Sequence, residues 1–79
     1  MGTKNDPGDF DCYEKAEPDE PMFVILARDP VAPLVVRHWA LLRELRGLNK
    51  TEDKQVLEAQ ICAANMATWR REHRGAEGE

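Results

Sequence analysis

A chain of 79 residues makes at most one small domain, in a size range where a single hydrophobic core is only marginally sufficient. Its composition, 42% hydrophobic and 33% charged, is globular, and its net charge of −4 argues against binding to duplex DNA, which requires several basic residues on one face. The charge is uneven, however. Residues 1–20 carry seven acids and two lysines, whereas residues 21–50 carry five basic and two acidic residues, so a local basic patch could hold a small anion.

Residues 1–18 are predicted to form a flexible acidic leader. They mix glycine, proline and acids, and Phe10 and Tyr13 are expected to anchor a turn of this leader on the rest of the domain. The segment has no apolar signal core, and the central apolar run is too short and too interrupted by proline to span a bilayer, so we expect no membrane partner. Cys12 and Cys62 show no disulfide or metal spacing, which favours reduced thiols in a cytosolic protein.

The segment 21–27, with the sequence PMFVILA, is apolar at every position. Because both alternating sets of side chains are apolar, a short buried β-strand and a short buried helix fit it equally well. We therefore expect an N-terminal extended segment or a short helix here, ahead of the main helical part of the chain.

A helix is predicted from Pro30 to about Arg46. Asp29 is a good N-terminal cap, Pro33 falls in the first turn where its missing N–H costs little, and Gly47 is a good C-terminal cap. At 100° per residue, one broad apolar stripe is expected to be buried. It comprises Val31, Leu34, Val35, Leu41, Leu42 and Leu45, with Trp39 at its edge and Arg37 and Glu44 opposite.

A second helix is predicted from about Glu52 to Arg74, capped by Thr51 or Asn49. One face carries Val56, Ala59, Cys62, Ala63, Met66, Ala67 and Trp69, and a separate apolar strip carries Leu57, Ile61 and Ala64. The short connection favours an antiparallel hairpin. The sequence thus predicts a mainly α fold, with a single helical domain over 19–74 and a disordered tail over 75–79.

Two helices cannot cover all of these apolar faces. Each large apolar side chain left in water forfeits about 1.5–3 kcal/mol, which is large against a total stability of about 5–15 kcal/mol. We therefore expect the chain to assemble as a homo-oligomer, most simply a dimer with a four-helix arrangement.

Signatures of catalysis and metal binding are missing from the sequence. It has no glycine-rich phosphate loop and no nucleophile elbow, and its cysteines and histidines lack the paired spacings of zinc sites. His38 lies near the centre of the first apolar stripe, where a histidine at a helix or subunit contact is a simpler interpretation than a catalytic base. The sequence predicts no enzyme activity, no metal site and no cofactor.

The arginines indicate a binding site instead. Arg28 directly precedes the first helix, where free amides favour an anion, and Asp29 begins it. Trp69, Arg70 and Arg71 place guanidinium groups beside an indole ring, an arrangement that holds nucleobases and phosphates. The simpler alternatives are an internal salt bridge of Arg28 and a set of arginines that merely solvates a helix end.

The central part of the chain resembles a group of small proteins encoded in tailed phages and prophages. Their shared pattern is matched by Asp19, Glu20, Pro21, Phe23, Arg28, Asp29, Pro30, Ala32, Pro33, Trp39 and Ala40. The resemblance spans roughly residues 12–70 and does not include His38. It implies a non-structural accessory protein of the host cytoplasm, a class in which some members bind host proteins and others sequester nucleotide messengers of host immunity.

Together these features lead to two functional hypotheses. In the first, the protein sequesters a small anionic ligand, such as a nucleotide immune signal. The site is expected at a subunit boundary, where Arg28 and the amides after Asp29 are joined by either Trp39 or the group Trp69, Arg70 and Arg71. In the second, it is a protein–protein inhibitor that presents its acidic leader to a host defence factor.

Overall fold

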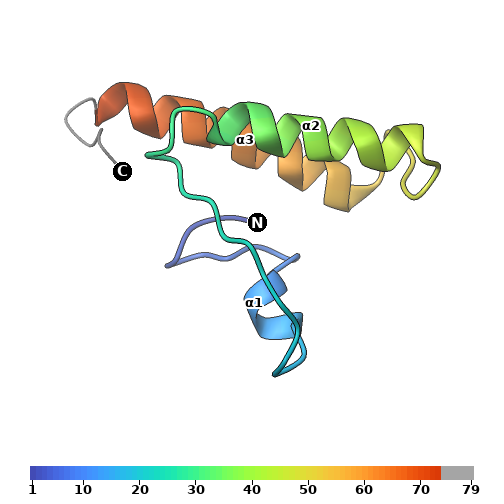
Figure 1. Cartoon of the computed structure of the whole chain (residues 1–79). Helices are drawn as coiled ribbons and strands as arrows, with labels where there is room; N and C mark the ends of the chain where they lie inside the picture. The colour runs from blue at the N-terminus through green and yellow to red at the C-terminus, as the bar shows by residue number, and fades with distance from the viewer. Residues whose placement is uncertain (74–79) are drawn as a thin grey trace.

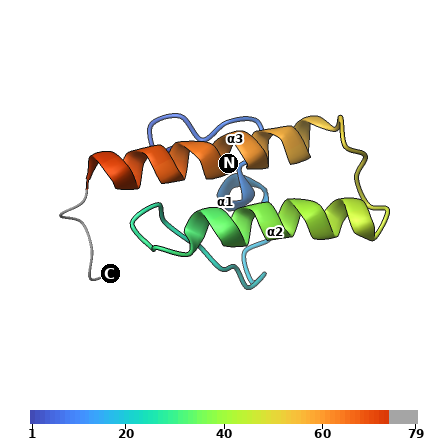
Figure 2. The same ribbon diagram turned by 90° about the horizontal axis from the view of Figure 1, so that it is seen from above.

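The chain forms a helical hairpin with an irregular N-terminal part. The structure is a computed structural model that describes residues 1–73, and these contain three helices and no strand: α1 (Cys12–Lys15), α2 (Ala32–Leu45) and α3 (Lys54–Glu72). α2 and α3 run antiparallel side by side, and the N-terminal part passes across one side of the pair (Figure 1; Figure 2). The mainly helical fold and the hairpin are confirmed. The predicted tail 75–79 and Arg74 lie outside the described residues.

The first helix begins later than predicted. Asp29 accepts a hydrogen bond from the Val31 N–H through its Oδ1 (3.0 Å), and its carbonyl oxygen accepts one from Ala32 (3.0 Å), so residues 29–32 form a turn. α2 therefore starts at Ala32 and not at Pro30, with Pro33 in its first turn as expected. It ends at Leu45, and Gly47 adopts a φ of +70° just beyond it, as suits the residue that follows a helix end.

The second helix also begins two residues later than predicted. Its N-terminal cap position is held by Asp53, not by Thr51 or Asn49. The Asp53 Oδ2 accepts hydrogen bonds from the Lys50 N–H (2.8 Å) and the Asn49 side-chain amide (3.1 Å), which tie the connecting loop together. These hydrogen bonds lower the pKa of Asp53. α3 consequently runs from Lys54 to Glu72.

Residues 21–26 form neither the strand nor the short helix considered for them. They are irregular, and only Ile25 among them is even half-buried, while Phe23 is 84% exposed and Val24 65% exposed. An isolated extended segment has no neighbouring strand with which to form a hydrogen-bonded ladder, so apolar composition alone does not make it a strand.

The hydrophobic core is small because it is built mainly from alanine. Val56 is its largest fully buried side chain, and the others are Ala32, Ala40, Ala59 and Ala63, all at most 1% exposed. Alanines let two helices approach closely, so few atoms are buried between them. The predicted face of the second helix is confirmed, because Cys62, Met66, Ala67 and Trp69 are half-buried and Leu57, Ile61 and Ala64 are exposed.

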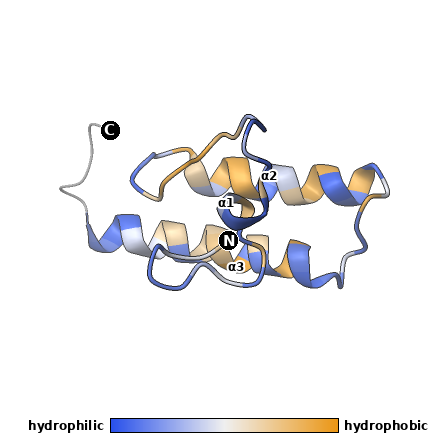
Figure 3. Ribbon diagram, turned by 90° about the horizontal axis from the view of Figure 1, so that it is seen from below, coloured by the Kyte–Doolittle hydropathy of each residue, from blue (hydrophilic) through white to orange (hydrophobic). Residues whose placement is uncertain are grey.

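The predicted burial of the apolar stripe on the first helix is wrong within one copy of the chain. α2 turns Ala32, Pro33, Val36 and Ala40 toward the interior, and its large aliphatic side chains point elsewhere. Leu34 is 63% exposed and Leu45 is 71% exposed. Figure 3 shows this apolar character along α2 and along the segment that precedes it.

Candidate functional site

Five of the six predicted ligand-binding residues belong to residues 28–31 and 69–73, at the end of the hairpin opposite its loop, which we call the hairpin end. Because α2 and α3 are antiparallel, the segment that precedes α2 lies toward the C-terminal turns of α3 (Figure 2). The contact is explicit, since the Arg70 Nη1 donates a hydrogen bond to the main-chain oxygen of Arg28 (2.5 Å). The segment that carries Arg28 and Asp29 is therefore joined to the turn of α3 that carries Trp69, Arg70 and Arg71.

Trp69 is stacked on a residue that the sequence analysis did not include in the site. The ring centres of Trp69 and His73 are 4.1 Å apart and the planes differ by only 9°. The His73 Nδ1 also lies 2.8 Å from the Trp69 carbonyl oxygen. The i, i+4 spacing could have indicated this pair. The aromatic surface of the hairpin end is thus an indole and an imidazole together.

The hairpin end carries three arginines, Arg28, Arg70 and Arg71, and two acidic residues, Asp29 and Glu72. Arg28 and Arg71 are exposed and Arg70 is half-buried, whereas the Asp29 carboxylate is half-buried and engaged with the Val31 N–H. Guanidinium groups on both sides of the gap between the helices make this end attractive to an anion. Its geometry differs from the phosphate sites in which one helix supplies all the charge.

The first main-chain amides after Asp29 are engaged within the turn. The Val31 and Ala32 N–H groups both donate to Asp29, and Pro33 has no N–H to donate. These positions therefore offer no amide to an anion, and the arginine side chains would have to supply most of its contacts.

Trp39 is not brought to the hairpin end. It lies seven residues beyond the start of α2, about 10 Å along the helix axis. The Arg43 guanidinium lies over the Trp39 ring, 5.7 Å from the ring centre, and this is an i, i+4 contact within α2. The prediction that Trp39 joins Arg28 in one site therefore has no support in the arrangement of a single chain.

The leader is held on α3 by Glu58, a role that sequence reasoning missed. The Glu58 carboxylate accepts hydrogen bonds from the N–H groups of Asp9 (3.2 Å) and Phe10 (3.3 Å), and its Oε1 lies 3.1 Å from the α-amino nitrogen of Met1. Partial burial, the strongest influence, raises the pKa of Glu58, but these hydrogen bonds and the amine charge together hold it below its usual value. Of the two predicted anchors, Phe10 is half-buried but Tyr13 is 76% exposed.

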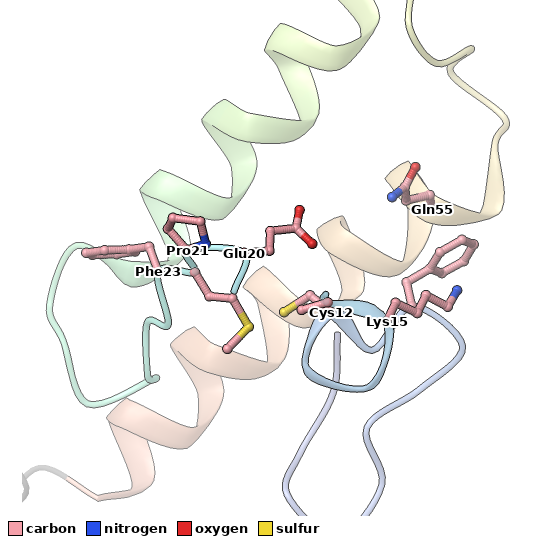
Figure 4. A pocket seen from close by; sticks show the side chains of 9 residues that line it. Cys12, Lys15, Glu20, Pro21, Phe23 and Gln55 are labelled. Atoms are coloured by element: carbon pink, nitrogen blue, oxygen red, sulfur yellow. The ribbon is translucent and has the colours of Figure 1, made fainter. Parts of the chain in front are cut away.

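A concave region lies between the leader and the hairpin, away from the hairpin end. It is an open pocket of about 400 Å³, lined by Phe10, Cys12, Lys15, Glu20, Phe23 and Gln55 among others (Figure 4). The lining joins the leader, the irregular segment and the first turns of α3. No local pattern in the sequence could have indicated it, because it exists only through the docking of these three segments.

Among residues 1–73, no three histidine, cysteine or acidic side chains lie close enough to hold a metal ion, and no helix is long and apolar enough to cross a membrane. Cys12 and Cys62 are both free thiols, and burial raises the pKa of the Cys62 thiol.

Comparison of the chain with models of protein families, with curated proteins and with solved structures found no match in any of the three. The functional argument is therefore carried by the geometry of the chain.

Proposed function

We propose that the protein is a non-enzymatic binding protein that holds a small anionic ligand, a nucleotide, at the hairpin end. The observation that carries the proposal is the hydrogen bond from Arg70 to the Arg28 carbonyl. It joins two segments that lie far apart in the sequence, and so places two arginines and an aromatic pair at one location. A nucleotide presents the two features that such a location recognises, a phosphate and a flat base.

Each part of the ligand has a partner at this end. Guanidinium groups bind phosphate through paired hydrogen bonds, and Arg28 and Arg71 both have exposed side chains. The stacked rings of Trp69 and His73 supply an aromatic surface beside those charges. Stacking of a base on an aromatic side chain contributes about 1–3 kcal/mol, so a mononucleotide could be held without a deep cavity.

Calorimetric titration against a panel of cyclic and linear nucleotides tests this function. Arg28→Ala and Arg71→Ala are each expected to weaken binding about tenfold or more, in line with the loss of a charge-assisted hydrogen bond. Arg37→Ala is the matched control, because Arg37 is an exposed arginine on the body of α2. Absence of binding across the panel at protein concentrations well above micromolar overturns the proposal.

The biological setting that we propose follows from the pattern in residues 19–40. In that setting the protein is a phage accessory factor of the host cytoplasm that lowers the concentration of a nucleotide immune signal and so blunts host defence. Expression of the protein should then restore phage growth on a host protected by nucleotide signalling. Arg28→Ala should abolish the rescue, and Arg37→Ala should preserve it.

A second candidate function is favoured by the exposure of the leader acids. Asp6, Asp9, Glu14, Glu17 and Asp19 are all exposed, so they present a negative surface to a partner protein. A protein–protein inhibitor acting through this surface should lose activity when Asp6, Glu14 and Glu17 are changed together to their amides. The same inhibitor should tolerate Arg28→Ala, which is the reverse of what the nucleotide proposal expects.

Self-association is part of the proposed function. The side chains left in water by a single copy include Leu34 and Leu45, each more than 60% exposed. A monomer would forfeit the free energy of burying them, whereas an oligomer would recover it.

A further inference from the structure

The side of α2 that faces away from α3 is a continuous apolar surface, which we call the outward face of α2. It comprises Val31, Leu34, Val35, His38, Leu41, Leu42 and Leu45. The aliphatic members are between 41% and 71% exposed, while Val36 and Ala40 on the other side of the helix pack against the α3 core. Steps of three and four residues between its members are the spacing of a helix that pairs with another helix.

The accessible surface of the chain is larger than that expected for a compact monomer of its mass. The accessible surface is 6347 Å², whereas a compact monomer of 9.0 kDa exposes about 4,900 Å². The excess of about 1,400 Å² is larger than the roughly 800 Å² that each partner buries in a stable interface of standard size, so a single copy leaves enough surface to form one.

The order of residues on the outward face is symmetric about His38. Val31 and Leu45 lie seven residues on either side of it, Leu34 and Leu42 lie four residues away, and Val35 and Leu41 lie three residues away. When two copies of such a face are placed antiparallel, apolar positions meet apolar positions along the whole length. Val31 then meets the partner's Leu45, Leu34 meets the partner's Leu42, and Val35 meets the partner's Leu41.

Charge favours the antiparallel orientation. Arg43 and Arg46 lie at the C-terminal end of α2, and a parallel pair would gather these arginines from both copies at one end. An antiparallel pair instead separates the two arginine ends, and it opposes the two helix dipoles.

We propose that two copies of the chain associate through the outward faces of α2, packed antiparallel about a twofold axis that passes near His38. This inference rests on the self-association proposed above and not on the nucleotide ligand. The two hairpins then form a layer of four helices, with the two copies of α2 in the middle. The outward face is covered, and His38 becomes a polar residue at the centre of the contact.

Sedimentation equilibrium on the full chain tests the interface. Leu42→Glu should raise the dissociation constant at least about a hundredfold, because the twofold axis places two carboxylates in the apolar contact. Ile61→Glu is the matched control, an exposed aliphatic residue on α3 that is 61% exposed and should leave the dissociation constant unchanged. His38→Leu should lower the dissociation constant about tenfold, since a polar residue in a helix seam costs stability.

A mixing experiment tests the orientation. Leu34→Lys and Leu42→Glu should each weaken self-association, but a mixture of the two variants should form a heterodimer. In that heterodimer the introduced lysine of one copy faces the introduced carboxylate of the other, and the second pair stays Leu34 with Leu42. A parallel pairing aligns position 34 with 34 and 42 with 42, so it gives no such rescue. Both wild-type side chains are exposed, and circular dichroism of each variant verifies the helical fold.

The results of these experiments distinguish self-association, the use of the outward face of α2 and the antiparallel orientation. A wild-type chain that sediments as a 9.0 kDa species up to hundreds of micromolar overturns both self-association and the interface. A dimer that survives Leu42→Glu but is lost with Ile61→Glu overturns the outward face alone. A dimer whose variants fail to rescue one another on mixing overturns the antiparallel pairing. Nucleotide binding is measured independently, so its absence bears only on the ligand.

Discussion

Arg70 and Arg28 are 42 positions apart in the sequence, yet the Nη1 of Arg70 donates a hydrogen bond to the Arg28 carbonyl oxygen at 2.5 Å. The contact closes the hairpin at the end opposite its loop, and it fixes the irregular segment before α2 against the last turn of α3. It therefore has a structural role and also assembles the candidate ligand site.

Replacement of Arg70 should destabilise the fold. Arg70→Ala removes the hydrogen bond to the Arg28 carbonyl and should lower the free energy of unfolding by about 1 kcal/mol, or about 4–8 °C in Tm for a domain of this size. Thermal denaturation followed by circular dichroism measures the change. Arg71→Ala, on the adjacent exposed residue, should leave Tm nearly unchanged. Equal effects of the two substitutions would show that the contact does not stabilise the hairpin.

Release of the leader should depend on the ionisation of Glu58. Its folded-state pKa is lowered from the usual 4.5, so its stabilising contribution is fully present above pH 4.5 and is lost as the pH falls through the lower folded value. Glu58→Gln should release the leader at neutral pH as well. Hydrogen exchange of the Asp9 and Phe10 amides, which donate to the Glu58 carboxylate, reports the change directly.

Glu52→Gln is the matched control for Glu58, because Glu52 is an exposed carboxylate just before α3. Slow exchange of the two amides in Glu58→Gln at neutral pH would argue against this anchor. Protection of the two amides, relative to their intrinsic exchange rates at the same pH, that persists in the wild-type chain far below the usual carboxyl pKa would do the same.

The loop between α2 and α3 should weaken when Asn49 is truncated. Its Oδ1 accepts a hydrogen bond from the Arg43 Nε (2.6 Å) and its amide donates to Asp53 (3.1 Å), so it joins the end of one helix to the start of the next. Asn49→Ala should cost about 1–2 kcal/mol in urea denaturation. Lys50→Ala, with an exposed side chain in the same loop, should cost much less. A similar loss in both variants would point to general loop sensitivity rather than to this network.

Close packing of the two helices should make Ala59 intolerant of a larger side chain. Ala59 is fully buried against α2, so Ala59→Leu should destabilise the hairpin by about 1–3 kcal/mol through overpacking. Ala64→Leu makes the same chemical change at an exposed position of α3 and should be nearly neutral. Chemical denaturation of the two variants side by side measures the difference. A neutral Ala59→Leu would mean that the helices are not held at close distance.

The helices could be predicted from the sequence because their signals are local. The 3.6-residue periodicity, Asp29 and Pro30 before α2, and Gly47 after it all act within a few residues of the chain. The predicted starts, Pro30 and Glu52, lie two residues before the observed ones, because local signals do not separate a turn from the first residue of a helix. Asp29 and Asp53 each hydrogen-bond to nearby main-chain groups in turns, and the choice between a turn and a first helical residue depends on small differences in geometry.

The assignment of faces needed the tertiary structure. Periodicity identifies the large apolar stripe of α2 but does not say what lies against it. In the folded chain α3 packs on the opposite side of α2, through Ala32 and Ala40, because small residues permit the closer approach of the two helices. The stripe that the sequence predicts to be buried is consequently exposed in a single copy of the chain.

Part of the candidate site could be predicted and part could not. Arg28, Asp29, Trp69 and Arg70 are recognisable from residue type beside a helix end, and the antiparallel hairpin brings them together. The place of Trp39 along α2, the pairing of Trp69 with His73 and the anchoring of the leader by Glu58 depend on three-dimensional distance. The amino-acid sequence alone determined which segments coil and which side chains are apolar or charged, since these follow from neighbours along the chain. Only tertiary packing decided which of those side chains meet, because such contacts depend on how closely the backbones of distant segments can approach.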